Sequence, residues 1–146
     1  MSDFPHHLAQ VSANLKLRRD ELVGAVSGLK DADLVRARRG GWTVGKVLEH
    51  ITNSEWHYAR LVANLRGRGE VAHENHAAAG VADASEALAS SRAALLNAID
   101  GVSEEDFYRL GPIGREEYSV VSVLENVEQH DIEHLGQIRA IQADSR

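Results

Sequence analysis

One segment near the carboxyl end combines a helical apolar stripe with polar residues that interrupt it. Between Val120 and Ile141 the apolar residues recur at the three- and four-residue spacing of one helix face. This stripe consists of Val120, Val123, Leu124, Val127, Leu135, Ile138 and Ile141. At ~100° per residue, His130, Asp131 and His134 lie ~280°, ~20° and ~320° around the helix from Val120, within the same stripe. The segment therefore predicts a long amphipathic helix with three polar side chains on its core face.

Polar groups on a core face cost several kcal/mol unless a partner satisfies them. His130 and His134 are four residues apart, so their imidazoles are neighbours on the helix and can bind one metal ion together. The alternative is that each is a hydrogen-bonded core histidine. A third ligand must come from another helix, and His50 is the leading candidate because it lies on the flank of a second apolar stripe.

The apolar pattern predicts four helices in a chain of 146 residues. They extend over about residues 5–29, 42–66, 83–102 and 119–141, and the third begins with a capping-box-like Asp83–Ala84–Ser85–Glu86. Glycine-containing connections separate them, at about 67–82 and at 111–114. Aromatic residues make up only 5% of the chain, which disfavours a β-sheet core. We expect an all-α fold, a four-helix bundle, with residues 1–146 as one domain.

The second and fourth predicted helices have similar amino-terminal sequences. The segment 42–51, WTVGKVLEHI, aligns with 118–127, YSVVSVLENV, and in each an aromatic residue precedes a Thr or Ser in the N-cap position. This similarity predicts a pseudo-repeat of two helix pairs about an approximate twofold axis; chance similarity of two well-capped, valine-rich helices is the alternative. The same offset of 76 residues pairs Glu55 with Asp131.

Composition excludes several classes of function. The chain contains no cysteine, so it has no disulfide, no thiolate metal site and no cysteine nucleophile. Its net charge of −6 argues against nucleic-acid binding, and we interpret the Arg18–Arg19 pair as part of a solvated helix face. No apolar run resembles a signal peptide or a membrane-spanning helix, so we expect a soluble cytoplasmic protein with no membrane partner.

Two motifs together resemble the DinB-like superfamily, which includes YfiT-type metal-dependent hydrolases and mycothiol-dependent maleylpyruvate isomerases. The first is Trp-Thr-Val-x-x-Val-Leu-x-His-Ile at 42–51, and the second is His-Asp-x-x-His-Leu-Gly-Gln-Ile at 130–138. The resemblance covers essentially the whole chain. It implies a four-helix bundle that holds a divalent metal ion, commonly zinc or nickel, on three histidines. Carried onto this sequence, the ligands are His50, His130 and His134.

Three neutral imidazoles leave coordination positions open for water or a substrate, which favours a catalytic site over a structural one. Asp131 and Glu55 are both expected to face the core, and we predict a catalytic role for them, as proton acceptors or as groups that orient the ligands. The alternative is that they form ordinary buried hydrogen bonds. Gln137 and Glu49 are weaker candidates for orienting the ligands, and we interpret them as surface groups.

Several members of the superfamily transfer a low-molecular-weight thiol to an electrophile. The resemblance therefore implies a metal-dependent thiol S-transferase, with a small-molecule electrophile and a thiol as partners. Two alternatives remain open: a hydrolase that uses metal-activated water, and a non-catalytic metal-binding or dimerisation module. An acidic, alanine-rich bundle has apolar helix faces through which a homodimer could form. The sequence does not define the substrate, the thiol or the choice between zinc and nickel.

Overall fold

The computed structural model describes residues 2–69, 71–73, 75–113 and 115–144. Four long helices form the bundle: α1 (Phe4–Ser27), α2 (Val44–Leu65), α3 (Val81–Ile99) and α5 (Val120–Asp144). The shorter elements are a 3-10 helix η1 (Asp31–Val35), a helix α4 (Glu104–Tyr108), and strands β1 (Gly111–Ile113) and β2 (Glu116–Tyr118). The predicted all-α four-helix bundle is confirmed.

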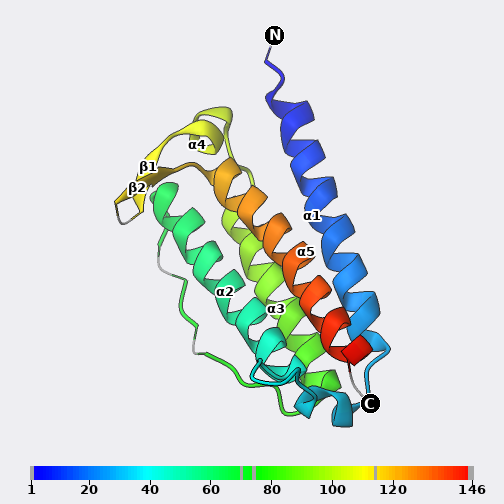
Figure 1. The fold of residues 1–146 in the computed structure, drawn as a ribbon. Helices are drawn as coiled ribbons and strands as arrows, with labels where there is room; N and C mark the ends of the chain where they lie inside the picture. The colour runs from blue at the N-terminus through cyan, green and yellow to red at the C-terminus, as the bar shows by residue number, and fades with distance from the viewer. Residues whose placement is uncertain (1, 70, 74, 114, 145–146) are drawn as a thin grey trace.

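The four helices do not simply alternate in direction. Helices α1 and α5 run the same way along the bundle, and α2 and α3 run the opposite way (Figure 1). Because α2 and α3 are parallel, the chain between them returns along the length of the bundle beside α2 (Figure 1). Helix α5 packs against both α1 and α2, so the helix that carries His130 and His134 is next to the helix that carries His50.

The predicted amino-terminal caps of α2 and α5 are confirmed. The Thr43 hydroxyl accepts a hydrogen bond from the backbone N–H of Lys46 at 3.0 Å. The Ser119 hydroxyl accepts one from the backbone N–H of Ser122 at 3.2 Å, and Ser122 Oγ accepts one from the Ser119 N–H at 2.9 Å. These bonds satisfy backbone donors that have no partner within the helix.

The predicted start of α3 was wrong by two residues. The helix begins at Val81 after Gly80, and no side chain of its own caps it. Asp31 of η1 instead accepts a hydrogen bond from the Val81 N–H at 2.9 Å, and Asp83 accepts one from the Ala79 N–H at 2.8 Å. The capping carboxylate thus comes from a residue 50 positions earlier in the sequence, which local pattern reading does not detect.

The core consists of two apolar clusters with a layer of charged residues between them. One cluster includes Leu15, Ala59, Leu95 and Val127, and the other includes Leu22, Ile51, Leu88 and Leu135. Along each of the four long helices, the buried charged or polar residue is flanked by a residue of one cluster on one side and a residue of the other cluster on the other side. This layer consists of Arg19, Glu55, Ser91, Arg92 and Asp131, all buried. The interpretation of Arg19 as part of a solvated face was therefore wrong: its position is on the buried stripe of α1.

A β-hairpin and a short helix occupy the connection between α3 and α5, where the sequence analysis predicted only a loop. Strands β1 and β2 pair antiparallel, with Gly111 opposite Tyr118. The hairpin lies at the end of the bundle where α2 ends and α5 begins (Figure 1). Gly114, the last residue of the predicted connection, lies outside the described residues. Among the described residues, no helix is long and apolar enough to span a membrane.

Candidate metal centre

The structure brings the three predicted ligands together between α2 and α5. His130 Nε2 lies 3.1 Å from His50 Nε2 and 3.0 Å from His134 Nε2. The candidate ligand atoms of all three residues lie within 4.8 Å of one another, and each residue is partly buried. His50 comes from the first half of α2 and the other two come from the second half of α5. Since these helices are antiparallel, the three histidines lie at the same depth in the bundle.

The surroundings of the imidazoles orient their Nε2 atoms toward one point. His134 Nδ1 lies 2.8 Å from Gln137 Oε1, and a carbonyl oxygen can only accept. The proton of His134 is therefore on Nδ1, which leaves the Nε2 lone pair directed at the other two rings. His50 Nδ1 has Ser54 Oγ at 3.5 Å, and the Trp42 ring lies edge-on to the His50 ring with centroids 5.1 Å apart. Gln137 was interpreted from the sequence as a surface group. Its hydrogen bond to His134 gives it a role in fixing the tautomer of that ring.

Burial keeps two of these rings neutral. Burial, together with smaller contributions from the neighbouring His134 and His50, lowers the pKa of His130 to about 4. Burial also lowers the pKa of His50, with smaller contributions from His134 and Lys46. A neutral imidazole has a free lone pair, whereas a protonated one has none. The neutral His130 and His50 rings can thus offer lone pairs to a cation near neutral pH.

Asp131 and Glu55, the predicted catalytic carboxylates, lie in the charged layer beside the histidines. Arg19 donates to both oxygens of Asp131 at 3.0 and 3.1 Å and to Glu55 Oε1 at 2.9 Å. Arg92 donates to Glu55 Oε2 at 2.7 Å and to Asp131 Oδ2 at 3.0 Å, and Ser91 Oγ donates to Glu55 Oε1 at 2.6 Å. Burial opposes the charge on Arg19, but the two carboxylates outweigh it and raise the pKa of its guanidinium.

These contacts connect all four long helices, since Arg19 belongs to α1, Glu55 to α2, Arg92 to α3 and Asp131 to α5. Two positive and two negative side chains balance each other within the layer. Neither carboxylate makes a hydrogen bond to His50, His130 or His134, as far as the described residues show. Their predicted part in catalysis stays a prediction. Arg19 and Arg92 were missed, although the four-residue step from Leu15 to Arg19 places that arginine on the core face.

Three of the other described histidines, His7, His73 and His76, contact groups outside the centre. His73 stacks on Trp56 with ring centroids 4.1 Å apart, and His76 Nε2 lies 2.8 Å from Asp83 Oδ2. His7 Nδ1 lies 2.7 Å from the Tyr108 hydroxyl at the far end of α1. His73 and His76 both lie in the segment between α2 and α3.

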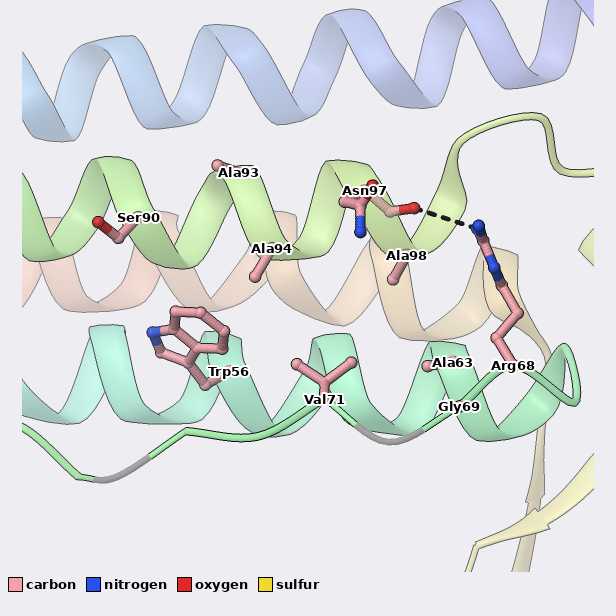
Figure 2. A pocket seen from close by; sticks show the side chains of 10 residues that line it. All are labelled: Trp56, Ala63, Arg68, Gly69, Val71, Ser90, Ala93, Ala94, Asn97 and Ala98. Carbon is pink, nitrogen blue, oxygen red and sulfur yellow. Dashed lines mark hydrogen bonds between the residues drawn. The ribbon is translucent and has the colours of Figure 1, made fainter.

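Cavities occur on two faces of the bundle. One of about 650 Å³ lies between α2, α3 and the chain that follows α2, with Trp56 at one end and Arg68 at the other (Figure 2). Arg68 donates a hydrogen bond to the Asn97 carbonyl there (Figure 2). None of the three clustered histidines lines this cavity. Another, of about 480 Å³, lies over α2, the start of α5 and the β-hairpin, and includes Tyr58. The Tyr58 ring lies edge-on to that of His130 with centroids 5.9 Å apart, so this second cavity adjoins the centre.

Comparison with solved structures identifies two similar folds. A DinB-like protein from Bacillus cereus is 14% identical and superposes with a TM-score of 0.74, over 91% of this chain and 89% of that one. A DinB-like protein from Bacillus subtilis, YjoA, is 10% identical with a TM-score of 0.68, over 94% of each chain. No curated protein matches the sequence.

The family is established by a match to the sequence. The family model described as the DinB superfamily matches residues 14–138, which include most of α1, the whole of α2 and α3, and all three clustered histidines. The chain therefore belongs to the DinB superfamily, and its three-histidine group is a site that could hold a metal ion.

Proposed function

We propose that this protein is a metal-dependent enzyme that transfers a low-molecular-weight thiol to a small electrophile. The single observation that carries the proposal is the convergence of three Nε2 atoms, from His50, His130 and His134, on one point between α2 and α5. A neutral imidazole can offer its Nε2 lone pair to a metal ion, and one cation placed among these three nitrogens can bind all of them.

The spacing of the nitrogens fits a divalent ion. Zinc–nitrogen bonds of about 2.0–2.1 Å at tetrahedral angles place ligand nitrogens about 3.3–3.4 Å apart. The two Nε2–Nε2 distances of 3.0 and 3.1 Å are within a few tenths of an ångström of that spacing. Imidazole suits zinc, nickel and copper, so the donor set supports a transition metal and disfavours calcium or magnesium.

The centre offers three protein ligands and no fourth within the described chain. The nearest buried carboxylates are engaged by Arg19 and Arg92, so they are not free to close the site. Because neutral imidazoles add no negative charge, a divalent ion held here would keep its full charge and would have coordination positions free for a further ligand. It could lower the pKa of a thiol or a water molecule bound at such a position. Gln137 fixes the His134 tautomer, and the charged layer fixes α2 against α5.

Membership of the DinB superfamily supports thiol transfer, since thiol-dependent transfer is known among DinB-like proteins. The chain supplies no cysteine, so the nucleophilic sulfur must come from a separate small molecule. All three histidines are only partly buried, so they are accessible from solvent.

Metal analysis combined with a thiol panel tests the proposal. Purified protein is assayed for bound zinc and nickel, then for the conjugation of monochlorobimane with cysteine, glutathione, coenzyme A, mycothiol and bacillithiol. We expect one metal ion per chain and metal-dependent conjugation with at least one thiol. His130→Ala should lose both, whereas the exposed His6→Ala should retain both. Full metal stoichiometry in His130→Ala would overturn the site, and metal without thiol conjugation would overturn the transfer reaction.

A further inference from the structure

A groove between α2 and α3 is separate from the three histidines, which lie between α2 and α5. It consists of two cavities, of about 650 and 490 Å³. Trp56 and Ser90 line both of them, so the cavities adjoin at these two residues. Figure 2 shows Trp56 directed from α2 toward α3 at one end of the larger cavity. None of the three clustered histidines lines either cavity, so a ligand bound here would not contact the metal centre.

The smaller cavity contains a buried hydroxyl without a partner. Thr52 on α2 is only 3% exposed and lines this cavity. Its hydroxyl forms no hydrogen bond with any other residue that the structure describes, and its oxygen is not sealed from solvent. Buried polar side chains normally have a hydrogen-bond partner, and an unmet one costs stability. The Thr52 hydroxyl is therefore placed to bond to a molecule in the cavity.

The charges around the smaller cavity favour a cation. Two carboxylates line it, and no lysine or arginine is among the described residues that do so. The Ala79 N–H, and then His76, lower the pKa of Asp83, so this carboxylate is ionised at neutral pH. Glu86, three positions later on α3, forms no hydrogen bond or ion pair with another described residue. The indole of Trp56 adds an aromatic face, which attracts cations.

The larger cavity continues the groove with apolar side chains. Its lining includes Val71 and, on α3, Ala94 (Figure 2). Arg68 lies at the far end and donates a hydrogen bond to the Asn97 carbonyl at 3.1 Å. The rise along α3 from Glu86 to Ala94 is about 12 Å. An apolar chain suits this stretch, whereas a second cation would approach Arg68.

We propose that this groove binds a small primary amine that carries an apolar chain. The protonated amino group donates to the Glu86 carboxylate and to the Thr52 hydroxyl, beside the Trp56 indole. The chain lies along Ala94 in the larger cavity. The carboxylates select an ammonium group over a neutral hydroxyl at one end, and Arg68 at the other end selects a monoamine over a diamine. The site is additional to the metal centre and does not rest on the proposed function.

Nuclear magnetic resonance tests the proposal with hexylamine, which is protonated at neutral pH. The neutral counterpart is 1-hexanol, and the doubly charged one is 1,6-diaminohexane. The ¹H–¹⁵N spectrum of the full chain is titrated with each compound at pH 7, as purified and again after a chelator has removed any metal. We expect hexylamine to shift the amides of Thr52 and Glu86 and the indole N–H of Trp56 in both preparations, and not the indole N–H of Trp42. The other two compounds should bind more weakly.

Variants separate the contributions of the hydroxyl and the carboxylate. Thr52→Val keeps the side-chain shape and should weaken hexylamine binding about fivefold, whereas Thr52→Ser keeps the hydroxyl and should bind like the wild type. Glu86→Gln should weaken hexylamine binding about threefold and leave 1-hexanol unchanged. The matched control is Glu125→Gln, which removes an exposed carboxylate on α5 outside both cavities and should change neither.

The outcomes are distinct from those that test the metal centre. Hexylamine binding that persists after chelation and is weakened in Thr52→Val and Glu86→Gln supports the groove, whether or not the protein carries a metal. Shifts that are centred on the three histidines and vanish on chelation would show that the amine binds a metal ion instead, and would overturn the groove. Equal affinity for hexylamine and 1-hexanol would overturn the ammonium assignment, and equal affinity for 1,6-diaminohexane would overturn the choice of a monoamine.

Discussion

The guanidinium of Arg19 spans both carboxylate oxygens of Asp131, with Nε at 3.0 Å from Oδ2 and Nη2 at 3.1 Å from Oδ1. Asp131 directly follows His130 in α5, so this paired contact fixes the rotation of α5 about its axis where the predicted ligands project. The same arginine reaches Glu55 on α2, which directly follows Ser54 and lies within two turns of His50. Arg19 thus ties together the two helices whose histidines must meet.

Removal of one partner from this layer should destabilise the fold. In Asp131→Ala, the buried Arg19 and Arg92 lose one of their two carboxylate partners. Breaking a buried ion pair in this way typically lowers the free energy of unfolding by about 3–5 kcal/mol. Urea unfolding followed by circular dichroism, with a chelator present, measures this loss. The control is Asp20→Ala, which breaks an exposed pair with Lys16 and should cost under about 1 kcal/mol. Similar losses in the two variants would show that the buried layer contributes no more than a surface pair.

The metal-free protein should lose stability on acidification below about pH 6.5. Burial lowers the pKa of His130 to about 4 in the folded chain, whereas an unfolded histidine titrates near its ordinary value of about 6.5. Between these values the unfolded chain binds more protons, so the free energy of unfolding falls as the pH falls, down to the folded pKa.

Unfolding by urea at a series of pH values, with a chelator present, measures this slope. His130→Gln removes the titrating group and should flatten the curve between pH 4 and 6.5 relative to the wild type. His6→Gln, at an exposed position, should leave the slope unchanged. A wild-type curve that matches His130→Gln throughout this range would contradict the expected protonation state.

The bundle could be predicted from the sequence because apolar residues recur at helical spacing wherever one helix face is buried. This spacing extends over about five turns or more in α1, α2 and α5. It also predicted His50, His130 and His134 as ligands of one ion, because two of them share a helix face, the third lies on the flank of another apolar stripe, and the family resemblance implies the same three. The amino-terminal caps could also be predicted, because the hydroxyls of Thr43 and Ser119 each accept a hydrogen bond from a backbone N–H only three residues later.

Features that depend on distant pairing were not predictable in this way. Arg19 was interpreted as exposed because a charged residue is seldom buried alone, and its partners are 36 and 112 positions away in sequence. The hairpin strands have three residues each, too few for a period-2 pattern. Gln137 is a different case: its partner His134 is only three positions away, but a hydrogen bond between two side chains leaves no mark in the apolar pattern.

Nickel binding should be reported by one tryptophan and not by the other. The chain has two, and the Trp42 ring lies 5.1 Å from that of His50, whereas Trp56 stacks on His73. A bound nickel ion quenches indole fluorescence at short range. In Trp56→Phe, where only Trp42 emits, titration with nickel should quench strongly, and in Trp42→Phe it should quench weakly. Equal quenching in the two variants would place the bound nickel elsewhere.

Gln137 should control metal affinity although it is not a predicted ligand. Its Oε1 accepts the Nδ1 proton of His134, which holds the Nε2 lone pair toward the centre. Loss of such an orienting partner typically lowers metal affinity about 10–100-fold, so we expect that change in Gln137→Ala, measured by competition with a chromogenic zinc chelator. Gln137→Glu keeps an acceptor and should bind zinc at least as tightly as the wild type. The matched control is Gln129→Ala on the same helix, because the Gln129 side chain bonds to Glu133 and not to a histidine. If Gln137→Ala and Gln129→Ala bind zinc equally well, the tautomer of His134 is set by something other than this hydrogen bond.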